Sequence, residues 1–420
     1  MIECMTSIVQ RRILPIIADR ATKTPVLLLE GPRSVGKSTM LAQLAANADV
    51  PVIDLDQDDY RRIAETSPSG VAAAALPVMI DEYQRVPALL DAIKARLNRE
   101  TRPGMFIIAG SASYDSLPQG TQALTGRLQR LPVLPLTQTE IDASGNRFIA
   151  QAFAGEIHHT GHLSASSRAD YVTRVMRGGM PLALAQPSDA DRARWFEGHV
   201  RQSIERDAGD LRRIGRNTDL QDVLVRAVGQ TGSVFNVSKV AQDVGPAWDT
   251  VAAYVELLES LFLIQRLPAW GVTVLPRGTE KPKIHVVDSG IGAHLLRLSP
   301  AKMDRLDPAS LTEFGHLLES FVVQEVIRQT TWLNEPVRAG HWRTRDTVEV
   351  DLVLERYDGA VIAIEIKAGD TIRSNQLSPL IALRERLGAS FTAGIVFYTG
   401  RAGYMVDDRI HVLPIDRLWA

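Results

Sequence analysis

The stretch from Gly31 to Ser38 has residue types whose spacing predicts chemistry with a polyphosphate. Its sequence, GPRSVGKS, fits the pattern G-x-x-x-x-G-K-[ST]. The glycines let the backbone wrap closely around phosphates, so that several N–H groups point at them. Lys37 would neutralise the β- and γ-phosphates, and the Ser38 hydroxyl would bind Mg²⁺. We therefore expect ATP and Mg²⁺ at a site made by Gly31, Pro32, Arg33, Ser34, Val35, Gly36, Lys37, Ser38 and Thr39.

The segments on either side of this loop are those that such a motif needs. Residues 26–30 form a short apolar run of strand length, and Met40, Leu41 and Leu44 follow the loop at helical spacing. The helix N-terminus adds a favourable partial positive charge at the phosphates. Motif and context agree, which disfavours a chance glycine turn.

Asp81 and Glu82 form a second candidate group. They end an apolar run that begins at Pro77, and an apolar strand ending in two carboxylates resembles a Walker B element. Asp81 would hold Mg²⁺, partly through water. Glu82 could orient and deprotonate the attacking water. These residues predict ATP hydrolysis in addition to ATP binding.

Two further polar residues each have a functional and a plain structural interpretation. Ser111 ends the apolar run that starts at Met105, where its hydroxyl could touch the γ-phosphate or the water, or could cap the next turn. Arg127 opens another strand and could stabilise transition-state charge in the site of a neighbouring subunit, or could be a surface arginine. The sequence leaves both alternatives open.

The fold class follows from the alternation of strands and helices between residues 26 and 135. The expected strands are continuous apolar runs, which indicates a parallel sheet covered on both faces. Ligands bind at the carboxyl ends of such strands, where Gly31, Asp81 and Ser111 fall. At 420 residues the chain is too long for one core. We expect a multidomain α/β protein with a P-loop ATPase core at 1–140, a helical lid at 141–217, a winged-helix-like segment at 218–275 and an α/β nuclease-like domain at 276–420.

The winged-helix expectation comes from residues 220–264, which contain three helical patterns in succession. In DNA-binding versions the third helix enters the major groove. Here residues 247–260 contain Asp249, Glu256 and Glu259 but no lysine or arginine. Acidic side chains repel phosphates, which favours a structural or lid role over base recognition.

A second constellation lies in the C-terminal third, where two alternating strands flank the turn signal Tyr357-Asp358-Gly359. If Arg356 pairs with Ala360 in this hairpin, Asp351 faces Glu365 and Glu349 faces Lys367 on the same side. The apolar residues of both strands would then share the opposite side.

Two interpretations compete for this hairpin. It could present a solvated face on which a Glu349–Lys367 pair offsets the repulsion between Asp351 and Glu365. Alternatively, the two carboxylates share a divalent metal, and Lys367 stabilises developing charge or orients water. The pattern D…E-x-K, preceded by a helix bearing Glu319, looks like the PD-(D/E)XK nuclease core. On that interpretation Asp351, Glu365 and Lys367 are catalytic and Glu319 is a further metal ligand.

Over nearly its whole length the chain resembles the prokaryotic AAA-type ATPases that have a C-terminal domain with a PD-(D/E)XK nuclease-like core. The motifs that match are GPRSVGKST at 31–39, VMIDEYQRVP at 78–87, IIAGSAS at 107–113, LTGRL at 124–128, GGMP at 178–181, Arg206-Asp207, KIHVVDSG at 283–290, LLESFV at 317–322, and EVDLVLE with EIK between 349 and 367. The resemblance implies ATP binding and hydrolysis, assembly into a homo-oligomer or ring, and association with DNA. Tyr83 departs from the pattern, because an apolar residue is expected there.

Composition restricts partners and compartment only weakly. The net charge of −2 and the pI of about 6.5 give no overall electrostatic signature of nucleic-acid binding. The single cysteine, Cys4, excludes an internal disulfide and a cysteine metal cluster. The first twelve residues lack the apolar region of a signal peptide, and no apolar run approaches the ~20 residues of a membrane span. We expect a cytoplasmic protein without a membrane partner.

These observations lead to two hypotheses of different classes. In the first, the chain is a Mg²⁺-dependent ATPase that acts on DNA, which its C-terminal domain binds or nicks. In the second, it is a nucleotide-gated switch or scaffold that acts on a protein partner, and its nuclease-like domain is catalytically inactive.

Overall fold

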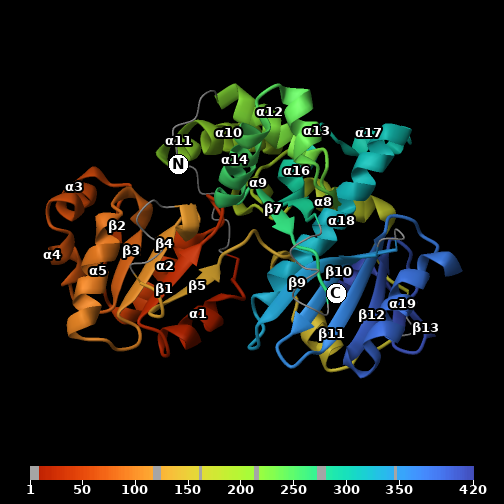
Figure 1. The fold of residues 1–420 in the computed structure, drawn as a ribbon, viewed down its shortest axis with the longest axis horizontal. Helices are drawn as coiled ribbons and strands as arrows, with labels where there is room; N and C mark the ends of the chain where they lie inside the picture. Colours follow the sequence, from red (N-terminus) through yellow and green to blue (C-terminus); the bar gives the residue numbers. More distant parts are fainter. Residues whose placement is uncertain (1–8, 117–123, 160–162, 212–216, 272–280, 345–347) are drawn as a thin grey trace.

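The computed structural model describes residues 9–116, 124–159, 163–211, 217–271, 281–344 and 348–420. Three parts lie next to one another (Figure 1). An α/β part formed by the N-terminal third lies beside a second α/β part formed by the C-terminal third. Helices from the middle of the chain cover the junction between them.

The N-terminal part contains a five-stranded parallel sheet, in the order β2-β3-β4-β1-β5. Its strands are β1 (Val26–Glu30), β2 (Val52–Asp54), β3 (Val78–Asp81), β4 (Phe106–Gly110) and β5 (Leu128–Pro132). Its helices are α1 (Leu14–Ala21), α2 (Lys37–Ala48), α3 (Asp58–Thr66), α4 (Pro68–Ala72), η1 (Tyr83–Arg85), α5 (Ala88–Arg99) and η2 (Tyr114–Ser116). The expected α/β class and parallel sheet are confirmed.

The alternation of side chains along β1 explains why helices cover both faces of this sheet. Leu27 and Leu29 pack in the same apolar cluster as Ile17 of α1 and Met40 of α2. Their neighbours Val26 and Leu28 pack on the other face, with the apolar side chains of α5. Both faces are therefore buried, as the continuous apolar runs predict.

The middle of the chain is mostly helical but does not form a single lid. Its helices are α6 (Gln138–Ile141), α7 (Phe148–Phe153), α8 (Arg168–Arg177), α9 (Pro181–Leu184), α10 (Asp189–Gln202), the π-helical turn η3 (Ser203–Asp207) and α11 (Ala208–Leu211). Helix α7 packs on the C-terminal sheet, where the rings of Phe148 and Phe397 lie 5.6 Å apart. The first part of the expected lid at 141–217 therefore belongs with the C-terminal part, because its aromatic side chain is buried there.

Three helices and a small sheet follow. They are α12 (Asn217–Val228), β6 (Ser233–Val234), α13 (Val237–Val244), α14 (Trp248–Ser260), β7 (Ile264–Leu267) and β8 (Lys283–Val286), and the strand order is β6-β8-β7. Strand β8 pairs with β7, so that Leu267 lies opposite Lys283. The expected domain boundary between 275 and 276 thus falls inside an antiparallel strand pair, and the division into domains stays a prediction.

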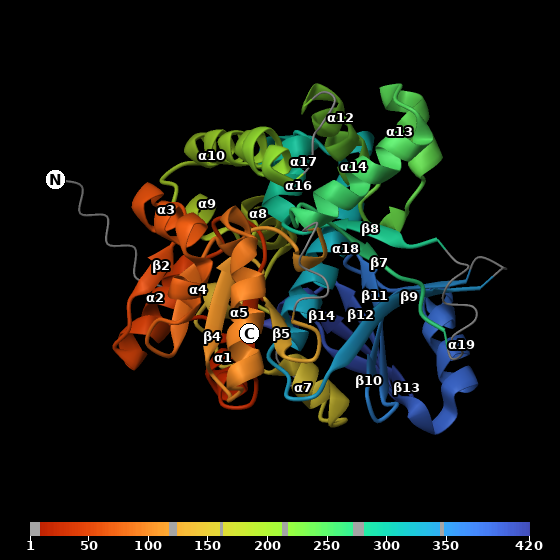
Figure 2. The same cartoon turned by 60° about the vertical axis from the view of Figure 1, so that its left-hand side comes forward.

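The C-terminal part contains a six-stranded mixed sheet, in the order β13-β14-β12-β11-β10-β9. Its strands are β9 (Val337–Arg343), β10 (Glu349–Arg356), β11 (Val361–Lys367), β12 (Phe391–Tyr398), β13 (Tyr404–Asp407) and β14 (Ile410–Pro414). Its helices and turns are α16 (Ser289–Leu295), α17 (Pro300–Asp304), α18 (Pro308–Thr330), η4 (Ser374–Gln376), α19 (Ser378–Leu387), η5 (Gly388–Ser390) and η6 (Ile415–Leu418). Helices α18 and α19 pack on opposite faces of the sheet. Figure 2 shows both sheets from another side.

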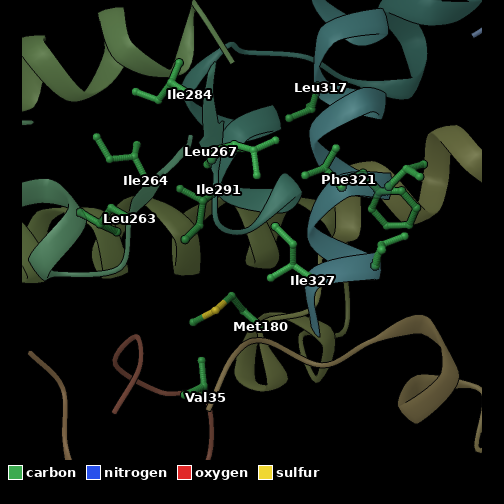
Figure 3. Packing of buried hydrophobic residues seen from close by; sticks show 14 of the residues in the cluster. Val35, Met180, Leu263, Ile264, Leu267, Ile284, Ile291, Leu317, Phe321 and Ile327 are labelled. Carbon is green, nitrogen blue, oxygen red and sulfur yellow. The ribbon is translucent and has the colours of Figure 1, made fainter. Parts of the chain in front are cut away.

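One continuous apolar cluster runs through all three parts. It includes Leu29 in the first sheet, Phe196 in α10 and Phe321 in α18. Figure 3 shows where Val35 of the glycine loop lies close to Met180, beneath the side chains of the middle and C-terminal parts. The three parts therefore share a core.

A buried charge pair lies where these parts meet. Asp288 is 1% exposed, and its carboxylate accepts hydrogen bonds from the N–H groups of Gly179 (2.7 Å) and Gly290 (3.0 Å). Arg328 is 4% exposed, lies 3.8 Å from that carboxylate, and donates to the carbonyl oxygen of Leu136 (3.0 Å). A Cβ atom at Gly179 would lie 2.2 Å from that same oxygen, so only glycine fits there. The GGMP and KIHVVDSG motifs thus meet at this junction.

We predict that Arg328→Met lowers the free energy of unfolding by about 3–5 kcal/mol, because the substitution leaves Asp288 buried beside no positive charge. Urea denaturation measures this change. Arg194→Met is the matched control, since Arg194 is exposed and pairs with the nearby Asp191. Equal stability of the two variants would contradict a structural role for the buried pair.

Candidate functional site

The glycine loop between β1 and α2 has the backbone that close contact with phosphates requires. Gly36 has φ 96°, in the left-handed region where glycine is favoured. A Cβ atom at Gly31 would lie 2.0 Å from the carbonyl oxygen of Val133. Both glycines of the motif are therefore needed for the loop to take this path.

Lys37 begins helix α2 and turns back over the loop. Its side chain is buried, and Nζ donates to the carbonyl oxygens of Gly31 (2.8 Å) and Pro32 (2.7 Å). Ser38 and Thr39 are exposed in the first turn of the helix. The ammonium group is thus held over the loop whose N–H groups would bind phosphates.

Asp81 lies at the carboxyl end of β3, close to the loop. Its side chain is 4% exposed, and burial raises its pKa even though the Ser38 hydroxyl hydrogen-bonds to it. The structure thereby brings together the two expected Mg²⁺ ligands from separate elements. A hydroxyl and a carboxylate oxygen are the hard ligands that Mg²⁺ takes, so these residues fit the ion.

Glu82 has a left-handed backbone (φ 53°) and belongs to a three-residue polar group. Its Oε2 accepts hydrogen bonds from the Ser111 hydroxyl (3.0 Å) and from Gln84 Nε2. Gln84 Nε2 also contacts the Ser111 oxygen (3.1 Å). Ser111 therefore contacts the expected general base, and Gln84 is a residue whose role the sequence did not reveal.

Tyr83 and Gly110 explain the one local departure from the expected pattern. Tyr83 is 1% exposed, and its ring packs directly on β4 where that strand ends. A Cβ atom at Gly110 would lie 2.5 Å from this ring and 2.6 Å from Gln84 Oε1. The glycine thus leaves room for a large ring beside Glu82 and Gln84.

Arg127 lies at the far edge of the parallel sheet. Its carbonyl oxygen accepts from the N–H of Val26, at the start of β1, whereas the glycine loop follows the end of that strand. Its guanidinium donates to Asn98 Oδ1 at 2.7 Å. Arg127 is therefore remote from the phosphate loop of its own chain, and its role in a neighbouring subunit's site stays a prediction.

The predicted register of the β10–β11 hairpin is confirmed. Leu352 pairs with Ile364, and the Arg356 N–H donates to the Ala360 oxygen at 2.9 Å. Asp351 Oδ2 accepts from the Ile366 N–H at 2.9 Å, so this carboxylate lies beside Glu365 as expected.

Two other expectations for this hairpin are wrong. Asp351 and Glu365 are 7% and 5% exposed, so they do not lie on a solvated face. The ladder between β9 and β10 shifts register between Val350 and Val353, and these two valines pack in the same cluster, away from Leu352. Strict alternation fails here because a β-bulge redirects the side chains next to Asp351.

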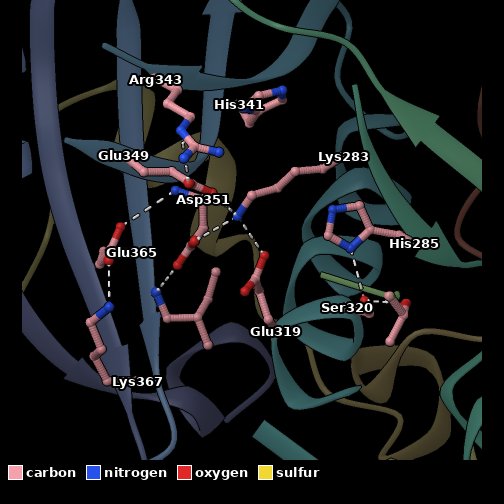
Figure 4. A network of polar contacts seen from close by, with 12 residues as sticks. Lys283, His285, Glu319, Ser320, His341, Arg343, Glu349, Asp351, Glu365 and Lys367 are labelled. Atoms are coloured by element: carbon pink, nitrogen blue, oxygen red, sulfur yellow. Dashed lines mark hydrogen bonds and ion pairs between the residues drawn. The ribbon is translucent and has the colours of Figure 1, made fainter. Parts of the chain in front are cut away.

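Lys283 is the main residue that sequence reasoning missed (Figure 4). Its Nζ contacts Glu319 Oε1 (2.8 Å), Glu349 Oε1 (2.6 Å) and Asp351 Oδ1 (2.9 Å). The expected pairing of Glu349 with Lys367 is wrong, because Lys367 binds Glu365 instead. The sequence feature that could have indicated it is a lysine at the start of the short strand pattern KIHVV, where Ile284, Val286 and Val287 are apolar.

The charges of this cluster influence one another strongly. Burial raises the pKa of Glu319 and of Glu365 to about 8. Burial alone would also raise the pKa of Asp351, but the ammonium groups of Lys283 and Lys367 outweigh it and lower that pKa. Asp351 thus stays charged beside two ammonium groups.

The expected metal site of Glu319, Asp351 and Glu365 is not assembled. In the part of the chain that the structure describes, no three His, Cys, Asp or Glu side chains are arranged to hold a metal ion. The physical reason is that Glu319 and Asp351 both turn towards the Lys283 ammonium, while Glu365 faces Lys367. Cys4 and the side chains of Arg206 and Asp207 lie outside the described residues.

Comparison with known families supports the N-terminal assignment. Residues 23–142 match a family described as an AAA domain. This match supports a P-loop ATPase and, with it, ATP binding. Residues 168–302 and 314–418 match two domains of unknown function, DUF8612 and DUF4143.

Among the helices that the structure describes, none has the length and apolar character that a membrane span requires.

Two curated relatives extend over almost the whole chain. Uncharacterized proteins of Mycobacterium bovis and of Mycobacterium tuberculosis are each 27% identical to it over 99% of its length and 86% of theirs.

Two solved structures show a distant likeness to this chain. The Walker-type ATPase of Pyrococcus abyssi is 15% identical, with a TM-score of 0.43 over 69% of this chain and 96% of its own. The RuvB Holliday junction branch migration motor of Thermotoga maritima is 15% identical, with a TM-score of 0.28 over 62% of this chain and 90% of its own. At these TM-scores the likeness establishes neither a shared fold nor a shared role.

We predict that Gly110→Ala lowers the free energy of unfolding by about 1–3 kcal/mol, because the added methyl group must push aside the Tyr83 ring or the Gln84 amide. Urea denaturation measures the change. Gly145→Ala is the control, since a Cβ atom there meets nothing within 4 Å. If Gly110→Ala and Gly145→Ala have equal effects, the close contact at Tyr83 is not a constraint.

Proposed function

We propose that this protein is a Mg²⁺-dependent ATPase. The observation that supports this most is the convergence of Lys37, Ser38, Asp81 and Glu82 at the carboxyl ends of β1 and β3, beside a loop that only glycine can complete. Each of these residues has a partner or position that fits its expected task.

The proposed roles follow from what each side chain can donate or accept. Lys37 moves from the loop carbonyls to the β- and γ-phosphates, where its charge offsets the charge that develops during transfer. Ser38 and Asp81 hold Mg²⁺, which neutralises the phosphate oxygens when bound. Glu82 takes the proton of the attacking water, and Ser111 and Gln84 orient its carboxylate. Arg127 would act in trans in a homo-oligomer or ring.

We predict that Lys37→Ala lowers ATP turnover about 100-fold or more, because one cation that stabilises the transition state is lost. Steady-state phosphate release with Mg²⁺ measures this, and chelation of Mg²⁺ should abolish turnover in the parent protein. Lys94→Ala is the matched control, since Lys94 is exposed on α5. If the parent protein and Lys37→Ala turn over ATP at equal rates, this site is not the one that hydrolyses ATP.

For the C-terminal part we propose DNA as the target, with a nuclease-like core. The order of elements supports this proposal: α18 precedes three antiparallel strands, β9 to β11, after which α19 leads into β12, parallel to β11. The compartment we propose is the cytoplasm.

One contact favours the second candidate function, a nucleotide-gated switch that acts on a protein partner. The N–H of Ser113, two residues beyond Ser111, donates to the Ser260 oxygen at the end of α14 (2.9 Å). The end of β4 is thereby attached to the middle part of the chain. A change at the nucleotide site can reach this helix without any contact with DNA.

A gel-shift series with duplex, single-stranded and branched DNA separates the two candidates. If DNA is the target, the full chain binds at least one form at low salt, and binding weakens as salt rises because Lys and Arg contacts to phosphates are screened. Lys37→Ala is the control, because it changes the glycine loop and leaves the C-terminal part intact. If the chain binds no form of DNA at low salt, DNA is excluded as the target, and the switch that acts on a protein partner is the remaining candidate.

A further inference from the structure

The carboxylate cluster of the C-terminal part is completed by a residue from another sheet. Glu349 and Asp351 lie on β10, and Glu319 lies on α18. Lys283, by contrast, begins β8, which pairs with β6 and β7 of the three-stranded sheet. The positive charge at the centre of the cluster thus comes from outside the sheet that bears two of its three carboxylates.

The ammonium group is fully satisfied in this position. It has three N–H donors, and three separate carboxylates lie 2.6–2.9 Å from Nζ. The Lys283 residue is 1% exposed, so these bonds are shielded from water and stronger than surface pairs. Lys367 contacts the fourth carboxyl group of the cluster, that of Glu365.

We infer that Lys283 is a tethered cation that closes this carboxylate site against divalent metal ions. A divalent ion would need the same oxygen atoms and would meet a positive charge a few ångströms away. As long as β8 stays in place, the cluster holds an ammonium group instead of a metal. This inference rests on the proposed nuclease-like role of the C-terminal part and adds to it a way of controlling metal binding. The inference does not depend on ATP hydrolysis.

Buried polar contacts hold β8 in this position on α18. The Ser320 hydroxyl contacts Thr231 Oγ1 (2.8 Å) and His285 Nδ1 (2.8 Å), and Thr231 Oγ1 accepts from the Val286 N–H (2.9 Å). A Cβ atom at Gly232 would lie 2.9 Å from the His316 oxygen. Lys283 can therefore leave the carboxylates only if this small sheet shifts or the side chain turns away.

The strand that bears Lys283 is also connected to the nucleotide site. The N–H of Ser113 donates a hydrogen bond to the carbonyl oxygen of Ser260, at the end of α14. The chain continues from there into β7, the strand that pairs with β8. A displacement of the segment after Ser111 would thus act on the small sheet. This gives the ATPase part a physical route to the tethered cation.

The test is Mn²⁺ binding to the full, nucleotide-free chain, measured by calorimetry. Lys283→Met keeps the length and apolar stem of the side chain but removes the charge, so it should bind one Mn²⁺ at least 10-fold more tightly than the parent protein does. Asp351→Asn in the Lys283→Met background should cancel this gain. Lys302→Met is the matched control, because Lys302 is exposed on α17 and should leave Mn²⁺ binding unchanged.

Several outcomes would overturn the inference. One is a Lys283→Met protein that folds and binds Mn²⁺ no more tightly than the parent. Another is a parent protein that already binds Mn²⁺ at a site lost in Asp351→Asn. If Lys283→Met does not fold, added Mn²⁺ should restore folding by replacing the lost charge, and failure of that rescue also counts against it. Because nucleotide is absent, none of these results bears on the ATPase itself.

Discussion

The buried pair of Asp288 and Arg328 is the interaction on which the arrangement of the three parts depends. Asp288 caps α16 and binds the backbone after α8, while Arg328 reaches back from α18 to the carbonyl of Leu136. Two charges buried together are tolerated when hydrogen bonds satisfy most of their remaining donors and acceptors. Within this pair, Nε of Arg328 is the atom that has no partner among the described residues. The backbone groups that satisfy them come from segments far apart in the chain, so the pair fixes the relative positions of those segments as well as its own geometry.

The nucleotide site and the carboxylate cluster solve the problem of buried charge in different ways. At the nucleotide site, Lys37 is held by backbone carbonyls and Asp81 by a hydroxyl, so each can exchange a neutral partner for a charged ligand. In the carboxylate cluster, Lys283 is held by three carboxylates, so any exchange must separate opposite charges in a buried environment. The first arrangement is ready for a ligand, whereas the second resists one.

The sequence predicted what is encoded over short distances along the chain. The glycine loop, the parallel sheet and the register of the β10–β11 hairpin each depend on spacing or on one turn, and the structure agrees with all three. Lys283 could not be placed in this way, because it lies 68 residues from Asp351 and meets it only through packing of β8 on α18. The bulge beside Val350 and the position of α7 on the C-terminal sheet likewise depend on contacts that local patterns do not contain.

The burial of Trp419 has a consequence for how this molecule can be divided. This side chain is 2% exposed and packs between Tyr171 and Phe321, while the carbonyl oxygens of Trp419 and Ala420 accept bonds from Ser144 and Asn146. The segment that follows the first sheet therefore hydrogen-bonds to residues from the far end of the sequence. Cutting the chain between the three family matches would break these contacts and expose apolar surface on every fragment. Although the chain matches three families, its three parts share one buried apolar cluster and are packed together as one unit.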